Sequence, residues 1–184
     1  MANGWDTLIS SYSQRVEIPD AARGGIGADY VIEGLTRRGL PRHVAEGFAM
    51  NFADESGFDP GINERNPIVA GSRGGFGLYQ LTGPRRRAYE AYAAQRGVGV
   101  SSPDAQMDFL MTELEGPEAA AAERIMATTT AGEAGAAIVN RFLRPAAEHR
   151  ERRAAKYLGG GGSYAPQVAE STPQFNRLWV DMGA

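Results

Sequence analysis

The chain has 184 residues, of which 42% are hydrophobic and 22% charged. This is an ordinary globular composition, and the length suffices for one core of useful size. Its 19 basic and 22 acidic residues give a net charge of -3, which excludes a general binder of nucleic acid. The chain contains no cysteine and only two histidines, His43 and His149. We therefore expect no disulfide, no metal and no other cofactor.

No stretch approaches the roughly 18 consecutive apolar residues that a membrane-spanning helix requires. Residues 1–6 also lack the basic and apolar regions of a signal peptide. We therefore expect neither a membrane span nor a signal peptide.

Glycine-rich segments near both ends divide the chain into three predicted parts. These are an N-terminal arm over residues 1–27, a compact domain over residues 28–158 and a glycine-linked C-terminal tail over residues 159–184. The tail contains Trp179, whose large apolar surface predicts either folding back on the domain or docking on a partner.

Helical patterns dominate the compact domain. Apolar spacing, with prolines at starts and glycines at ends, predicts helices over residues 29–38, 41–55, 84–95, 103–115, 117–127, 131–143 and 145–158. Residues 57–77 are rich in glycine and contain two prolines, which predicts loops or a small irregular β-hairpin. The predicted fold class is α+β and mostly helical.

Glu55 stands at the predicted end of the second helix, next to the glycine-rich segment. A carboxyl group in such a position can lean into an apolar cleft, where burial favours its protonated form. A protonated carboxyl is a general acid, and cleavage of a glycosidic bond needs one because the leaving oxygen must gain a proton. The spacing leaves open the alternative of a solvated residue at a helix C-terminus.

The sequence ESGFDP at residues 55–60, followed by GLYQ at residues 77–80, resembles the lysozyme-like superfamily. This superfamily includes goose-type lysozymes, soluble lytic transglycosylases and the phage tail lysozymes, of which the last group is the most similar. The similarity continues through QLTG at residues 80–83 and Arg86, through a helix with Gln106, Phe109, Leu110, Glu113 and Leu114, and through Phe142, Pro145, Arg150 and Arg153.

The resemblance implies a lysozyme-like domain with a small β-hairpin or loop element beside a cleft that binds the glycan strands of peptidoglycan. It implies Glu55 as the catalytic acid, with Tyr79 and Gln80 lining the saccharide subsites. The amphipathic phenol of Tyr79 suits a core position as well. Ser56 and Gly77, in the same two segments, are further candidate substrate-binding residues.

A second carboxylate would complete a hydrolase. Inverting enzymes need a base about 6.5–9.5 Å from the acid, and retaining enzymes a nucleophile at about 5–5.5 Å. Asp54 should point about 100° away from Glu55 and lie at the surface, and Asp59 should cap its own turn. We favour Glu64, in the loop expected to form one wall of the cleft. Lytic transglycosylases use a substrate hydroxyl instead.

Three other features favour structural explanations. Residues 71–77 are glycine-rich but lack the lysine of a phosphate-binding loop. The arginines at residues 85–87 predict a solvated face, with attraction to peptide carboxylates or a phosphate as the alternative. The basic residues of the last helix should pair with Glu148 and Glu151 along that helix.

The expected function is that of a peptidoglycan-degrading glycosidase that cleaves the β-1,4 bond between MurNAc and GlcNAc, with Glu55 as general acid. We expect it in the phage virion tail, acting on the bacterial cell wall or periplasm, with other tail proteins contacting its two arms. The alternatives are a lytic transglycosylase of the same fold and a non-catalytic structural tail or hub subunit.

Overall fold

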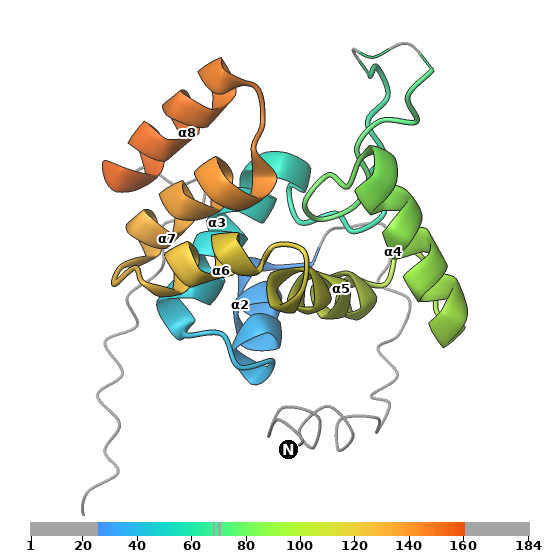
Figure 1. Cartoon of the computed structure of the whole chain (residues 1–184), viewed down its shortest axis with the longest axis horizontal. Coiled ribbons are helices and arrows are strands. Elements are labelled where there is room, and N and C mark those ends of the chain that lie inside the picture. Colours follow the sequence, from blue (N-terminus) through green and yellow to red (C-terminus); the bar gives the residue numbers. More distant parts are fainter. Residues whose placement is uncertain (1–25, 68, 70, 161–184) are drawn as a thin grey trace, which may run out of the picture.

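The computed structural model describes residues 26–67, 69 and 71–160, and these residues form a helical domain (Figure 1). The elements are α2 (Ala28–Arg37), α3 (Arg42–Ser56), α4 (Gly83–Arg96), α5 (Pro103–Glu115), α6 (Ala119–Met126), α7 (Ala131–Ile138), the π-helix η1 (Val139–Leu143) and α8 (Ala147–Leu158). Each predicted helix is present, and the one predicted over residues 131–143 continues as a π-helix in its last part. The predicted arms fall almost entirely outside the described residues.

Local signals place the helix ends. α3 ends at Gly57, which adopts the left-handed conformation with φ of 59° and donates its N–H to the carbonyl of Ala53. α5 begins at Pro103, after Ser102 accepts a hydrogen bond from the backbone of Ala105. Residues directly after α3 and directly before α5 therefore set where the chain turns.

The segment between α3 and α4 forms no β-hairpin in its described residues, so that part of the predicted fold class is not confirmed. Two isolated antiparallel bridges, Asn63 with Phe76 and Phe76 with Leu81, hold its loops together. Gly74 and Gly77 have φ values of 76° and 73°, which lie far from strand geometry and interrupt a ladder. In Figure 1 these loops project from the helical body beside α4.

The core is organised around α3, which packs against α2 and α7, while α7 packs against α8. A cluster of aromatic rings joins α3 to the rest of the site. The ring of Phe52 stacks on that of Tyr79 at 5.7 Å between centroids, and Phe142 of η1 lies 5.9 Å from Tyr79 and 5.8 Å from Phe48. Aromatic packing thus holds residue 79 of the loop segment against the end of α3.

Helices α3 and α7 cross at very short range. A Cβ atom added to Gly47 would lie 2.7 Å from the backbone nitrogen of Gly135 and 2.8 Å from Cβ of Ala134. The buried side chain of Asn51 spans the crossing, since its Nδ2 donates to the carbonyls of Gly47 at 2.9 Å and Gly135 at 3.1 Å. The crossing fixes α7, and with it η1 and α8, against the second half of α3.

Candidate active site

Glu55 lies in the last turn of α3, where that helix meets both the loops of residues 57–82 and helix α8. Its side chain is only 14% exposed, and its Oε1 accepts a charge-assisted hydrogen bond from Nη1 of Arg153. The expected pairing of the last helix's basic residues with Glu148 and Glu151 is wrong here, because Arg153 reaches across to α3. The candidate acid is therefore held by a cation from the far end of the domain.

Asp54, the neighbour of Glu55, is also attached to α8. Lys156 Nζ lies 2.9 Å from its Oδ1, and the hydroxyl of Tyr157 donates to its Oδ2 at 2.7 Å. The expected surface position of Asp54 is wrong, since its side chain is 12% exposed. Burial, together with the hydrogen bond to Asp54, raises the pKa of the Tyr157 phenol, which keeps it a neutral donor at physiological pH.

Arg153, Lys156 and Tyr157 share one face of α8 because they are three and four residues apart. Tyr157 is 1% exposed and packs with Met50 and Val139 in a small apolar cluster beneath the charges. We call these three α8 residues and their two partners, Asp54 and Glu55, the acid clamp. The clamp joins two carboxylates of α3 to two cations of α8 over an apolar base.

The GLYQ segment at residues 77–80 is attached to α3 and α5. The buried hydroxyl of Ser56 lies 3.0 Å from the carbonyl oxygens of both Phe52 and Leu78. Gly77, with φ of 73°, leaves no room for a side chain because Gln106 fills the space where its Cβ would stand. Ser56 and Gly77 therefore fix the backbone of this segment beside Glu55.

Gln106 of α5 is fully buried, and its amide joins three loops. Its Oε1 accepts the N–H of Leu78 at 2.7 Å, and its Nε2 donates to the carbonyls of Pro60 at 2.7 Å and Val100 at 3.0 Å. Sequence reasoning included Gln106 in the resemblance without giving it a role. The sequence signal for this structural role is a glutamine on the apolar face of a predicted helix, because a buried amide needs hydrogen-bond partners.

Tyr79 and Gln80 make their hydrogen bonds within the protein. Tyr79 takes the core position that the sequence left open: it is 2% exposed, and its hydroxyl donates to Oε2 of Glu113 at 3.1 Å. Burial raises the pKa of its phenol well above the ordinary value, as does the adjacent Glu113 carboxylate. Gln80 is partly buried and donates through Nε2 to the carbonyl of Gly77 at 3.0 Å. Saccharide binding by these two residues stays a prediction.

Two of the three arginines at residues 85–87 do not form the expected solvated face. Arg85 binds the buried carboxylate of Glu113 through two hydrogen bonds of 2.7 and 2.9 Å. Arg86 pairs with Glu90 at 3.1 Å and donates to the carbonyl of Gly74 at 3.0 Å. The acceptors of these two arginines come from α5, from the next turn of α4 and from the loop before α4.

The other carboxylates near Glu55 in sequence have local partners. Oδ1 of Asp59 accepts the N–H of Gly61 at 2.8 Å, which confirms its expected turn-capping role. Glu64 is exposed, and its Oε2 accepts the N–H of Gly75 at 3.0 Å across the loop.

Within the described ranges, no three or more His, Asp or Glu side chains are grouped as metal ligands. In the same part of the chain, no helix combines the length and apolar character needed to cross a bilayer.

A model of the phage tail lysozyme family matches residues 27–158. The chain belongs to this family. The match runs from α2 to α8 and includes both sides of the acid clamp, which confirms the resemblance found in the sequence. Comparison with curated proteins gives no match. Membership in the phage tail lysozyme family implies a lysozyme-like enzyme that cleaves peptidoglycan, and a phage-associated protein that acts on the bacterial cell wall.

The role of Gln106 leads to a prediction about stability. Gln106→Leu keeps the side-chain volume but leaves the buried N–H of Leu78 without its acceptor. We expect the free energy of unfolding to fall by about 1–3 kcal/mol, and the amide of Leu78 to exchange with solvent faster. Denaturant unfolding and hydrogen exchange measure these effects. Gln95→Leu, at an exposed position of α4, is the control, and equal stability of both variants would contradict the assigned role.

Proposed function

We propose that this phage tail lysozyme hydrolyses the β-1,4 bond between MurNAc and GlcNAc in peptidoglycan, with Glu55 as the general acid. The observation that carries the proposal is the position of Glu55: its carboxylate is largely buried at the end of α3 and is oriented by Arg153. Both oxygens of Asp54 are engaged by α8, and Asp59 and Glu64 accept backbone hydrogen bonds within their loop, whereas Oε2 of Glu55 has no hydrogen bond from a described residue. Glu55 is thus the carboxylate of this region best suited to chemistry.

In this proposal, Glu55 protonates the glycosidic oxygen as the bond breaks. Arg153 contacts Oε1, and no described residue forms a hydrogen bond with Oε2. We assign the transferred proton to Oε2, with Arg153 as the residue that orients the carboxyl group. Gln80, the partly exposed member of the GLYQ segment, would contact a sugar, while Ser56, Gly77 and Tyr79 hold that segment in place.

Glu64 is the proposed second carboxylate, on the loop wall beyond Glu55. Its hydrogen bond with Gly75 N–H ties one oxygen to the opposite side of the loop. That engagement supports the alternative in which a substrate hydroxyl is the nucleophile, and the same fold then acts as a lytic transglycosylase. The two chemistries leave different ends on the glycan, so the products distinguish them.

The proposal predicts the products of peptidoglycan digestion. Wild-type protein should release soluble fragments with reducing ends, and Glu55→Gln should lower kcat by about 100-fold or more because the amide cannot donate the proton. Mass spectrometry of digested, purified peptidoglycan measures both. Anhydro-muramyl ends would assign transglycosylation instead.

The control for this experiment is Glu115→Gln, which removes an exposed carboxylate at the end of α5. It should match wild type. Glu64→Gln should abolish hydrolysis only if Glu64 is the second carboxylate. If neither wild type nor any variant releases fragments, the enzymatic proposal fails and the structural tail or hub alternative gains support.

Arg153 provides a separate test of how the acid is positioned. Arg153→Gln should lower kcat by about 10- to 100-fold through misplacement of the carboxyl group, with KM nearly unchanged. Arg153→Lys should recover part of the lost kcat, because a cation returns to the same face of α8. Steady-state kinetics on soluble glycan strands measure kcat and KM for both variants.

The matched control is Arg152→Gln, on the exposed side of the same helix, where the arginine side chain forms a hydrogen bond only with His149 among the described residues. It should retain full kcat. A rise in KM with kcat intact in Arg153→Gln would instead make Arg153 a substrate-binding residue.

We also propose that the protein is carried in the virion tail and that its terminal segments dock on other tail proteins. The structure offers a clean truncation point, because the N–H groups of Gly159 and Gly160 donate to the carbonyls of Ala155 and Tyr157 at the end of α8. Removing only residues 161–184 preserves these bonds and the acid clamp.

The truncated protein should cleave peptidoglycan at the wild-type rate and be missing from assembled particles. Immunoblotting of purified virions, produced by a phage that carries the truncated gene, measures incorporation. Full incorporation without residues 161–184 would refute the docking role of this tail.

A further inference from the structure

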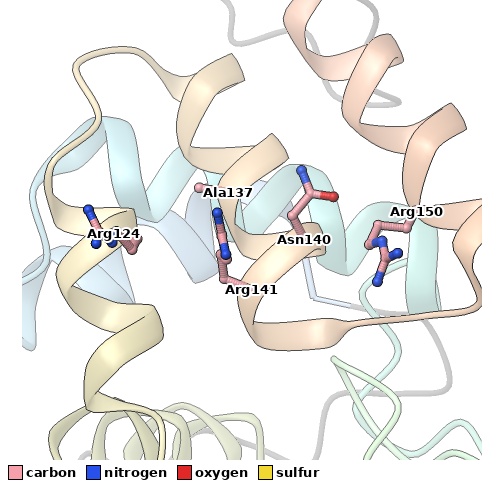
Figure 2. A pocket seen from close by; sticks show the side chains of 5 residues that line it. All are labelled: Arg124, Ala137, Asn140, Arg141 and Arg150. Carbon is pink, nitrogen blue, oxygen red and sulfur yellow. The ribbon is translucent and has the colours of Figure 1, made fainter.

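A hollow of about 580 Å³ lies where α6, α7, η1 and α8 meet (Figure 2). Its lining residues are Arg124 of α6, Ala137 of α7, Asn140 and Arg141 of η1, and Arg150 of α8. In Figure 2 the side chain of Arg150 extends from α8 toward Asn140 across the gap. Three guanidinium groups and one amide thus border a single space.

The three arginines differ from most others in the structure in having no acidic partner. Arg85, Arg144 and Arg153, for example, each form an ion pair with a glutamate. Among the described residues, no carboxylate forms an ion pair with Arg124, Arg141 or Arg150. In a chain of net charge -3, three unpaired cations around one hollow concentrate positive potential at that place.

The chemistry of the lining selects the ligand. Guanidinium groups bind planar carboxylates through paired hydrogen bonds, and the Asn140 amide can bind a peptide group at the same time. The single apolar side chain in the lining, the methyl group of Ala137, leaves little to bind an apolar ligand. The volume suits a short peptide segment with several carboxylates.

The hollow is adjacent to the acid clamp. Arg150 and Arg153 are three residues apart on α8, so they share a side of the helix and are separated by about 4.5 Å along its axis. Arg153 contacts Glu55. A ligand in the hollow therefore lies about one helical turn from the residue that holds the candidate acid.

We infer that this hollow binds the stem peptide of peptidoglycan through its free carboxylates. The inference rests on the proposed function, because a glycan strand held at Glu55 carries a peptide on its MurNAc residues. At about 3.3–3.6 Å per extended residue, a stem of a few residues is longer than the one helical turn that separates Arg150 from Arg153 on α8. The enzyme then recognises two parts of one polymer: the sugars near Glu55 and the peptide carboxylates at Arg124, Arg141 and Arg150.

The test compares two substrates that differ only in the stem peptides. One is peptidoglycan freed of phosphate polymers by hydrofluoric acid, and the other is the same material after an amidase has removed the stems. The triple variant Arg124→Gln, Arg141→Gln and Arg150→Gln should raise KM on the first substrate at least about fivefold. On the stripped glycan, wild type and this variant should have equal KM and kcat.

A second triple variant serves as the matched control. Arg37→Gln, Arg87→Gln and Arg96→Gln changes the net charge equally at exposed positions of α2 and α4, away from the hollow. This control should behave as wild type on both substrates. A binding readout independent of turnover comes from NMR titration of wild type with the isolated stem tetrapeptide, which should shift the side-chain signals of Arg124, Arg141 and Arg150.

Each outcome is decisive. Equal KM values for the hollow variant and wild type on stem-bearing substrate would overturn the inference, as would an equal loss in the control variant or on stripped glycan. Tighter binding of teichoic acid than of the tetrapeptide, lost in the hollow variant alone, would replace the peptide with a phosphate polymer and also overturn it. If wild type cleaves neither substrate, the proposed function has failed, whereas cleavage of both without discrimination defeats only the stem-peptide site.

Discussion

The close crossing of α3 and α7 is the constraint on which the rest of the structure depends. With glycine at position 47, α3 approaches the backbone of Gly135 to a distance that a single methyl group added at position 47 would block. Because α7 continues directly into η1 and then α8, its position determines where the last helix lies. Tyr157 packs against Gly135 from the other side, so α8 rests on the same crossing. Glu55 and Arg153, 98 residues apart in sequence, meet as a result.

Buried polar side chains, rather than a β-sheet, hold the loops beside Glu55. Gln106 satisfies one N–H and two carbonyl groups, and Ser56 joins the end of α3 to Leu78. The pair of Glu113 with Arg85 serves a related purpose, since it receives the Tyr79 hydroxyl. A buried ion pair adds little net stability, but loss of one partner is costly, so such contacts specify one loop conformation over others. Glycines 74 and 77, which prevent a regular ladder, can therefore stand in a segment with defined geometry.

Local signals in the sequence predicted nearly all of the helices, because capping residues, prolines and apolar spacing act within a few residues of the element they define. They also located Glu55, through its position between a helix end and a glycine-rich segment. Arg153, Lys156 and the buried state of Asp54 could not be found this way, since each depends on α8 folding over α3. The arginines at residues 85–87 were misassigned for the same reason: the partner of Arg85 stands 28 residues away. The hairpin is not confirmed in the described residues, because Gly74 and Gly77 have left-handed φ values that break a strand ladder within the segment.

Helix α8 combines two electrostatic roles that its sequence does not separate. The sequence predicts that its basic residues pair along their own helix, yet Arg153 and Lys156 neutralise carboxylates of α3, and Arg150 borders the hollow with no acidic partner among the described residues. The difference follows from position along the helix axis: positions 153, 156 and 157 lie over the acidic end of α3, while position 150, one turn earlier, lies opposite η1. Helix α8 therefore presents ion-paired cations over the end of α3 and, beside η1, an arginine without an acidic partner among the described residues.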